Sequence, residues 1–479
     1  MPDESEPSRE SDVPDQAKSV DAPAQWGDVL KIKDNREPRI LTSQHDSEGG
    51  LFLEENGKKH LPSQLRKEIE PWLTALFQSE YLSLLVGAGL PAAVQFLATQ
   101  RQTTTTGRVR VTEFEDEIDA AAKEMATSAG RGDGNIEDQL RAIDELLRGL
   151  RIYVPKDAAF RGSLALKKRV KRLTSEYERV LTDFAVGILQ LEQRIVNAPT
   201  VVPFNVLVNF LLSFASRSAT RQRLHVFTTN YDRTIEFGAE LAGLRLLDRF
   251  VGNMAPVFRS SRLEIDLHYN PPGIRGEPRY LEGVVHFTKL HGSLDWIYSE
   301  RYVRRKGLPF GSSALDFNIP SAAIDRPNIR SLMIFPNAAK DRETAEYPYV
   351  ELFRDFASAV CRPNSTLVLY GYSFGDEHIN RVIEDMLTIP STHLVVIAYD
   401  DRGSRIQRFY ERVGRGAQFT LLLGSHFGDL TTLVEYYLPK PAIDRSTIRM
   451  AELLKARGVV QSGDQSKHSR TENEEGIAS

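Results

Sequence analysis

Six short apolar runs, each ending at a glycine or a polar residue, constrain the fold of this chain more than any other feature. They span residues 81–86, 224–229, 284–290, 365–370, 394–399 and 418–423. Runs of this length that close on a glycine or a polar turn are typical of buried strands. Helical patterns follow several of them, for example from Arg233 and over 376–387. Short strands that alternate with helices predict an α/β fold with a mainly parallel sheet.

Amphipathic helical patterns fill much of the chain between the first two runs, at 114–125, 136–150 and 169–195. We expect a helical insertion at about 113–200 within a main domain that spans 72–440. Residues 26–71 are expected to form a small N-terminal segment, a β-rich cap on that domain. The polar terminal segments 1–25 and 458–479 are expected to be disordered, because they cannot bury enough apolar surface to offset the entropy of ordering.

A single cysteine, Cys361, limits the covalent and metal chemistry that is open to the chain. One cysteine cannot form an intrachain disulfide, so nothing points to an oxidising compartment. It also cannot build a zinc site from several thiolates. We therefore expect no metal.

The charge balance and the lengths of the apolar segments exclude further classes. The formal net charge is −4, which argues against direct binding of nucleic acid through bulk positive charge. The basic cluster at 167–172 is interpreted as a solvated helix face. The most apolar segments, 82–94 and 201–215, are shorter than the roughly 18–20 residues that cross a bilayer. The N-terminus is acidic, unlike a secretory signal. We expect a cytoplasmic protein without membrane contact.

The unusual residues of this sequence come directly after the predicted strands. In open α/β sheets, ligands bind outside the carboxyl ends of the strands, so residues near 87, 230, 291 and 371 are expected to meet in one pocket. Gly87-Ala88-Gly89 follows the first strand. Glycines let the backbone approach a phosphate closely, and the next helix would direct its amides at that anion. The alternative is a tight turn between strand and helix.

Three polar residues follow the second strand at alternate positions. Thr228, Asn230 and Asp232 would share one face of an extended chain. An amide and a carboxylate there can hold a sugar hydroxyl or a water molecule. The alternative is an Asx-type turn that caps the helix beginning near Arg233.

The later strand ends supply a histidine and a second glycine turn. His291, followed by Gly292, is placed to act as a general base, because the histidine pKa lies near neutrality; the alternative is a structural histidine. Gly371 and Ser373 could take a second part of a nucleotide. The alternative there is a turn in which Asp376 caps the next helix.

The order of these motifs resembles that of the sirtuin NAD-binding domain. A GAG turn, a T-x-N-x-D stretch, a His-Gly pair and a G-x-S turn each follow a strand, and the resemblance covers about residues 81–425. It is closest to the sirtuin-like NADases of bacterial anti-phage defence. The stretch 135–138 also resembles a helix start that is common in this branch. The resemblance implies a Rossmann-like parallel sheet with a helical insertion and disordered termini.

Carried over residue by residue, the resemblance implies a role for each motif. Asn230 would hold the nicotinamide ribose or the attacking water, supported by Asp232, and His291 would be the general base. Asp400 is a further candidate for the adenosine ribose. The implied cofactor-binding residues are Gly87, Ala88 and Gly89 at the pyrophosphate, Gly371 and Ser373 on the adenosine side, and Thr228 and Asp232.

The implied activity is hydrolysis of NAD+ to nicotinamide and ADP-ribose, with NAD+ as substrate and no metal. The resemblance also implies regulation through a homo-oligomer, a HerA-type ATPase, an Argonaute-like partner or a phage protein. One alternative is a protein deacylase or ADP-ribosyltransferase, but deacylases carry a zinc ribbon on four cysteines, which this chain cannot supply. The other is a non-enzymatic scaffold that binds NAD or ADP-ribose.

Overall fold

The computed structural model describes most of the chain between its two terminal segments. The described residues are 26–33, 37–45, 51–101, 108–128, 134–153, 161–215, 222–261, 266–269, 279–299, 302–313 and 347–440. The segments 1–25 and 458–479, which were expected to be disordered, lie outside these residues. Within the described ranges, no helix is both long and apolar enough to cross a membrane.

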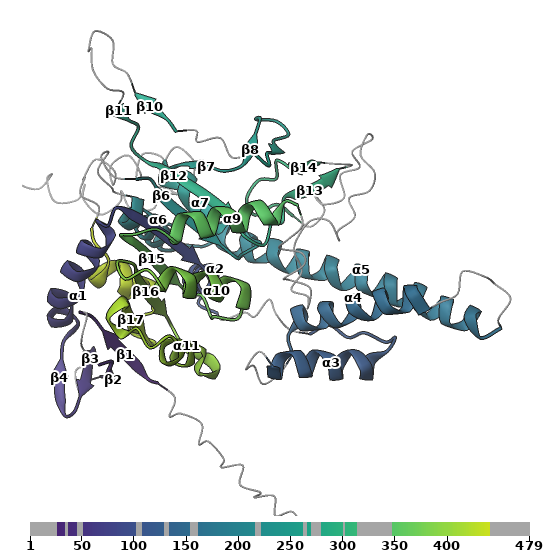
Figure 1. The fold of residues 1–479 in the computed structure, drawn as a ribbon, viewed down its shortest axis with the longest axis horizontal. Helices are drawn as coiled ribbons and strands as arrows, with labels where there is room; N and C mark the ends of the chain where they lie inside the picture. The colour runs from purple at the N-terminus through teal and green to yellow at the C-terminus, as the bar shows by residue number, and fades with distance from the viewer. Residues whose placement is uncertain are drawn as a thin grey trace, which may run out of the picture.

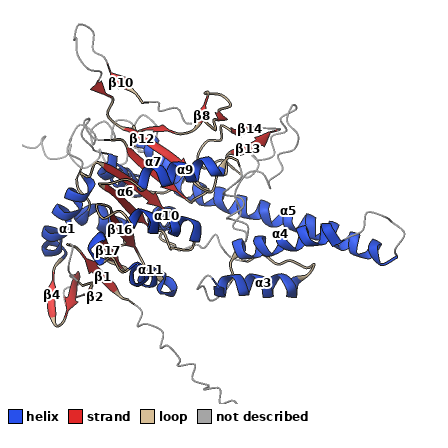
Figure 2. Cartoon of the chain, in the orientation of Figure 1, coloured by secondary structure: helices blue, strands red, loops and turns tan. Residues whose placement is uncertain are grey.

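An eleven-stranded sheet runs through the centre of the molecule (Figures 1 and 2). Its order is β4-β3-β2-β1-β17-β16-β15-β5-β6-β12-β7. The strands are β1 (Asp28–Lys31), β2 (Arg39–His45), β3 (Leu51–Glu55), β4 (Lys58–His60), β5 (Tyr81–Val86), β6 (Leu224–Thr228), β7 (Arg245–Leu247), β12 (Val284–Lys289), β15 (Ser365–Tyr370), β16 (His393–Ala398) and β17 (Phe419–Leu423). The seven strands from β17 to β7 are parallel. The predicted α/β fold with a mainly parallel sheet is confirmed.

Helices cover both faces of the parallel strands, which explains their continuous apolar character. Successive strand residues point to opposite faces, so Leu84 lies in one buried cluster and Leu85 in the other. The first face is covered by α1 (Pro62–Phe77), α2 (Gly89–Thr99), α6 (Val202–Ala215), α7 (Thr234–Leu241), α12 (Leu430–Thr432) and the π-helix Leu433–Tyr437. The second is covered by α9 (Tyr349–Val360), α10 (Glu377–Leu387) and α11 (Arg405–Val413).

The N-terminal strands continue the main sheet at one edge. β1 pairs antiparallel with β17, with Val29 opposite Leu423. β2, β3 and β4 then follow as an antiparallel meander. Residues 26–71 thus supply four strands and the start of α1, which packs on the same sheet.

The helical insertion comprises α3 (Glu115–Ser128), α4 (Ile136–Tyr153) and α5 (Arg161–Val196). In Figure 1 these helices project away from the sheet as an elongated arm. They build a third buried cluster, which also contains Tyr231 and Leu294. These two residues follow β6 and β12, so the insertion packs directly against the loops at the carboxyl ends of the sheet.

Short strands form two smaller antiparallel units that the sequence did not indicate. One sheet contains β8 (Phe250–Val251), β9 (Val257–Phe258), β13 (Trp296–Ser299) and β14 (Tyr302–Arg305). The other pairs β10 (His268–Tyr269) with β11 (Arg279–Tyr280). In Figure 1 both lie on the side of the main sheet that ends in β12 and β7. Strands this short carry no readable periodicity.

Candidate active site

A large cleft opens at the point where the order of the parallel strands reverses. From β5 the chain proceeds to β6 and β12 on one side, and it returns to β15, β16 and β17 on the other. Such a reversal leaves a crevice at the carboxyl ends of the strands. The cleft has a volume of about 2110 Å³, and its walls come from strand ends, from α4 of the insertion and from α10 and α11. The sheet topology therefore creates the binding space.

Two glycine turns cross at the floor of this cleft. The amide of Gly87 donates to the Tyr370 carbonyl at 2.9 Å, and the amide of Gly89 donates to the Gly371 carbonyl at 3.1 Å. A Cβ atom on Gly87 would lie 2.4 Å from the Gly371 oxygen, and Gly371 has a φ of +62°. The glycines are required by this backbone crossing, as the tight-turn interpretation proposed. Gly87, Ala88, Gly89 and Gly371 also line the cleft, so a ligand can approach the same backbone.

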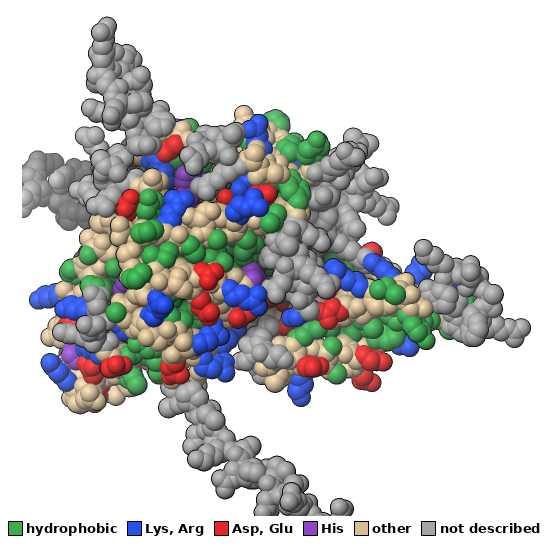
Figure 3. Space-filling model, in the orientation of Figure 1, with side chains coloured by type: hydrophobic (Ala, Val, Ile, Leu, Met, Phe, Trp, Pro, Cys, Tyr) green, Lys and Arg blue, Asp and Glu red, His purple; other side chains and the backbone are tan. Residues whose placement is uncertain are grey.

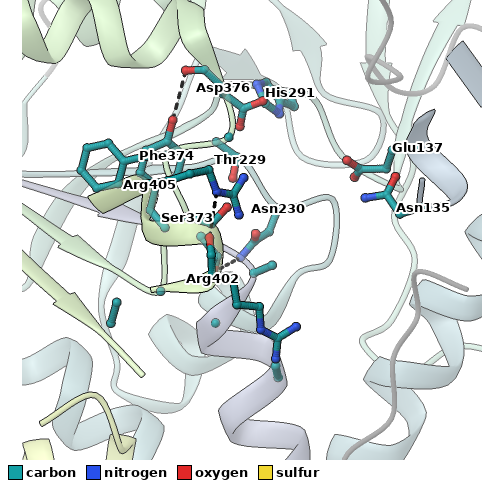
Figure 4. Close-up of a pocket in the computed structure, with 18 of the residues that line it drawn as sticks. Asn135, Glu137, Thr229, Asn230, His291, Ser373, Phe374, Asp376, Arg402 and Arg405 are labelled. Atoms are coloured by element: carbon teal, nitrogen blue, oxygen red, sulfur yellow. Dashed lines mark hydrogen bonds between the residues drawn. The ribbon is translucent and has the colours of Figure 1, made fainter. Parts of the chain in front are cut away.

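Asn230 is held against the first glycine turn. Its Nδ2 donates to the Gly87 carbonyl at 2.8 Å, and the residue is 8% exposed. This bond orients the amide, because it places the donor end at Gly87 and the acceptor Oδ1 at the opposite end. Asn230 lines the cleft, and Figure 4 shows it beside Thr229 and across from the start of α4.

Thr228 lies beneath the cleft and is not part of its lining. Its hydroxyl donates to the Val86 carbonyl at 2.9 Å and accepts from the backbone amide of Asn230 at 3.0 Å. The residue is 1% exposed. Thr228 therefore ties β6 to β5 and positions Asn230. Thr228 was expected to contact a cofactor, but it is not among the residues that line the cleft.

Asp232 lines the cleft and also caps a helix. Its Oδ1 accepts from the Thr234 amide at 2.9 Å, which is the Asx-type turn proposed as the alternative. The Lys289 ammonium donates to the Asp232 carbonyl and pairs with Glu236 at 3.0 Å. Burial raises the pKa of Glu236 to about 7, against the opposing effect of Lys289. The loop after β6 is thus held by the buried ammonium group of Lys289.

A buried ion pair joins this loop to the helical insertion. Glu192, near the end of α5, accepts from the Arg233 amide at 2.9 Å and from its guanidinium at 2.5 Å. Their side chains are 0% and 7% exposed respectively. Arg233 also donates to the Leu308 and Pro309 carbonyls. The position of the insertion and that of the loop after β6 are therefore linked.

His291 lies two residues beyond the end of β12 and is 4% exposed. Its Nε2 is 3.1 Å from Nε2 of His378, near the start of α10. One ring nitrogen must donate and the other accept at this distance. Ligand atoms of His291, His378 and Asp376 all lie within 4.8 Å of one another. The sequence reasoning tested only thiolate metal sites and missed His378, although Asp-x-His directly follows the second glycine turn.

The second glycine turn is braced by buried hydrogen bonds. The Tyr372 hydroxyl donates to Oδ1 of Asn380 at 3.0 Å, and Nδ2 of Asn380 donates to the Phe374 carbonyl at 3.1 Å. Burial raises the pKa of Tyr372 well above its usual value, so it stays neutral. Asp376 occupies the position before α10, but its side chain makes no capping bond. Ser373, within this turn, lines the cleft.

Basic residues cluster where the adenosine side was expected. Asp400 lines the cleft and pairs with Arg402 at 2.8 Å, in an exposed position where such a pair stabilises little. Six arginines that the sequence analysis did not identify line the cleft. Arg141 lies in α4, and the other five lie in or near α10 and α11: Arg381, Arg402, Arg405, Arg408 and Arg412. Figure 3 shows basic side chains over α10 and α11 on this face. They give that part of the cleft a positive charge, which suits phosphate groups.

The start of α4, in the helical insertion, forms the opposite wall of the cleft. The Asn135 side chain accepts from the Asp138 amide at 2.9 Å, and the Asp138 carboxylate accepts from the Asn135 amide at 3.0 Å. This reciprocal cap fixes the helix start expected at 135–138. Asn135 and Glu137 face Asn230 and His291 across the cleft (Figure 4).

The comparisons with known proteins agree with this geometry. A search of curated proteins finds no match for the chain. Residues 224–415 match the family model of the SIR2-like domain. The matched part includes Asn230, His291 and Gly371, whereas Gly87 and Gly89 precede it. The sirtuin-like family indicated by the motifs is therefore supported: residues 224–415 are similar to a SIR2-like domain.

Proposed function

We propose that the protein is an NAD+ hydrolase that cleaves the bond between nicotinamide and ribose. One observation carries the proposal. The amide of Asn230, anchored to the Gly87 carbonyl at 2.8 Å, shares one cleft with His291 beside the crossing of the two glycine turns. The cleft therefore combines an oriented amide, a base and a backbone that a phosphate can approach. A SIR2-like domain over 224–415 supports an NAD-related activity.

The reaction requires few kinds of group. Nicotinamide leaves as a neutral molecule from a cationic pyridinium, so its departure needs no acid. The enzyme must stabilise an oxocarbenium-like ribose and deliver water. The C1′–N bond breaks with its electron pair going to nicotinamide, and water adds at C1′ and loses a proton. Asn230 orients the ribose or the water, and His291 accepts the proton.

The remaining lining residues suit the rest of the dinucleotide. Gly87 and Ala88 lead into α2, which begins at Gly89, and the positive end of the helix dipole there attracts an anion. The arginines at α11 add positive charge along the same cleft. We assign the pyrophosphate to the first glycine turn, Gly87 to Gly89, and the adenosine side to Gly371, Ser373 and Asp400.

We further propose that the activity is regulated and serves anti-phage defence by depleting NAD+. A constitutively active NAD+ hydrolase would harm its own cell. The link between the insertion and the catalytic loop, through Glu192 and Arg233, is a route by which assembly could act on the site. The activator would be a second copy of the chain, a HerA-type ATPase, an Argonaute-like protein or a phage protein.

A time course of NAD+ measured by chromatography tests the proposal. The full chain is assayed alone and with each candidate activator. NAD+ is also measured in cells that carry the protein, with and without infection. Asn230→Ala and His291→Ala should each abolish NAD+ loss while circular dichroism stays unchanged. His45→Ala, an exposed histidine on β2, is the matched control and should retain full turnover.

Three results would contradict the proposal. Full turnover by both cleft variants would remove Asn230 and His291 from the reaction. An acyl-ADP-ribose product formed with an acyl-lysine peptide would identify a deacylase instead. Binding of NAD+ without its consumption under every condition would identify a scaffold.

A further inference from the structure

Three potential metal ligands converge in the described part of the cleft, and two of them, Asp376 and His378, have no role in the reaction proposed above. His291 lies two residues beyond the end of β12, whereas Asp376 directly precedes α10 and His378 lies in its first turn. The two Nε2 atoms are 3.1 Å apart, and one ligand atom from each residue lies within 4.8 Å of the others. Figure 4 shows Asp376 and His291 adjacent at the edge of the cleft. Residues separated by 85 positions in sequence thus form one donor cluster.

The distance between the imidazole nitrogens fits a shared metal ion. Two nitrogens bound to one zinc ion at about 2.0–2.1 Å with a tetrahedral angle lie about 3.3–3.4 Å apart. The observed 3.1 Å requires only a few tenths of an ångström of adjustment. Asp376 is partly exposed and its side chain does not cap α10. One of its carboxylate oxygens already lies within 4.8 Å of a ring nitrogen of each histidine, which places a third donor beside the same ion.

The type of donor selects the class of ion. Two imidazoles and one carboxylate suit borderline divalent transition metals, whereas Mg²⁺ and Ca²⁺ prefer sites made of oxygen atoms. All three residues line the cleft, so a fourth coordination position would face the substrate space. Phe353 packs beside both rings, with its centroid 4.8 Å from that of His378 and 6.4 Å from that of His291, and limits their movement.

We propose that His291, His378 and Asp376 bind a divalent transition metal ion of the zinc class, and that the bound ion inhibits the enzyme. A metal ion and a proton use the same lone pair of a neutral imidazole. While Nε2 of His291 coordinates the ion, that nitrogen cannot accept a proton from water or ribose. The inhibitory part rests on the proposed function, whereas metal binding does not.

Metal binding is measured first, without NAD+. The purified full chain, stripped with a chelator, is titrated with Co²⁺, whose visible absorption reports coordination, and Zn²⁺ is then added to displace it. His378→Gln, His378→Ala and Asp376→Asn should each bind Co²⁺ at least tenfold more weakly than the wild type. Circular dichroism checks that each variant is folded, and the glutamine variant preserves polarity if the alanine variant fails to fold.

A second histidine pair provides the matched control. His225 and His286 have ring centroids 4.6 Å apart on β6 and β12. His225→Ala should bind Co²⁺ as the wild type does, and Mg²⁺ should not displace the bound Co²⁺. Wild-type binding by His378→Gln, or loss of binding in His225→Ala, would overturn the site.

The inhibitory part is measured as a ratio within each variant. NAD+ turnover in chelator, divided by turnover in Zn²⁺, should exceed ten for the wild type and His225→Ala and fall close to one for His378→Gln. If the wild type binds the metal but its turnover ratio stays near one, or if Zn²⁺ activates it, the proposal that the ion inhibits the enzyme is wrong. If no NAD+ is consumed at all, the Co²⁺ spectra still decide the site, and the failure belongs to the proposed function.

Discussion

The amide of Gly89 donates a hydrogen bond to the carbonyl of Gly371 over 3.1 Å, and neither residue has room for a side chain. A Cβ atom on Gly89 would lie 2.6 Å from the Cα atom of Gly371. This contact joins two turns that are 282 positions apart in the sequence. It brings the ends of β5 and β15 together where the order of the sheet reverses, and it makes the floor of the cleft from backbone alone.

Replacement of Gly87 by alanine should damage both the fold and the site. The added Cβ atom would lie 2.4 Å from the Gly371 oxygen, a backbone atom that cannot rotate away. Overpacking of this kind costs about 1–3 kcal/mol. We expect a lower midpoint of denaturant unfolding and loss of NAD+ turnover. Gly149→Ala in α4, where no atom lies within 4 Å, should be neutral or stabilising by up to about 1 kcal/mol. Equal unfolding midpoints for the two variants would contradict the contact.

Asn230→Asp should abolish activity although the side chain keeps its size. A carboxylate cannot donate to the Gly87 carbonyl, and the two oxygen atoms would repel each other in a buried position. We expect turnover to fall about 100-fold or more, as when an oriented donor is removed from a reacting centre. Stability should fall by about 1–3 kcal/mol. Asn197→Asp, at the exposed end of α5, serves as the control. An Asn230→Asp enzyme with wild-type kinetics would show that the amide donor is dispensable.

Breaking the pair between Glu192 and Arg233 should loosen the insertion. Glu192→Gln leaves a buried guanidinium without its carboxylate, which costs about 3–5 kcal/mol. Protease cleavage within the arm should therefore increase together with the loss of stability. Asp183→Asn breaks an exposed pair with Arg179, of which both side chains are 49% exposed, and should cost about 0.3–0.5 kcal/mol. Similar stability losses in the two variants would argue against a buried connection.

The free energy of unfolding should depend on the ionisation of Glu236, in the helix that follows the loop after β6. Its pKa is raised to about 7 from 4.5, mainly by burial. Because the folded protein holds this proton more tightly than the unfolded chain, the stabilisation is complete below about pH 4.5. It is lost as pH rises through about 7. The free energy of unfolding contributed by this group should fall between pH 5 and 8, and Glu236→Gln should remove that decrease.

Denaturant midpoints of wild type and variant, compared at each pH, isolate the effect of Glu236. The comparison is needed because other groups titrate in the same range. Burial lowers the pKa of His393 to about 4, which makes stability rise between about pH 4 and 6.5. Glu240→Gln, on the exposed side of α7, should keep the wild-type dependence. A Glu236→Gln profile parallel to that of the wild type would refute the assignment.

Local patterns predicted the parallel strands well. The runs at 81–86 and 365–370 coincide with β5 and β15, because both strands are covered on both faces and end at glycines. The predicted alternation of Thr228 and Asn230 failed for a local reason. β6 ends at Thr228, so the rule that alternate residues share a face no longer holds beyond it, and the threonine points into the protein.

The sequence by itself determined the α/β class, the strand ends that carry Gly87, Asn230, His291 and Gly371, and the start of α4 at Asn135. Each depends on residues within one strand, turn or helical cap, where periodicity and backbone preference act. Only the tertiary structure decided that β1 pairs with β17, that Glu192 is joined to Arg233, and that His378 meets His291. Those contacts join residues 41 to 394 positions apart, and pairing over such separations depends on how whole elements pack.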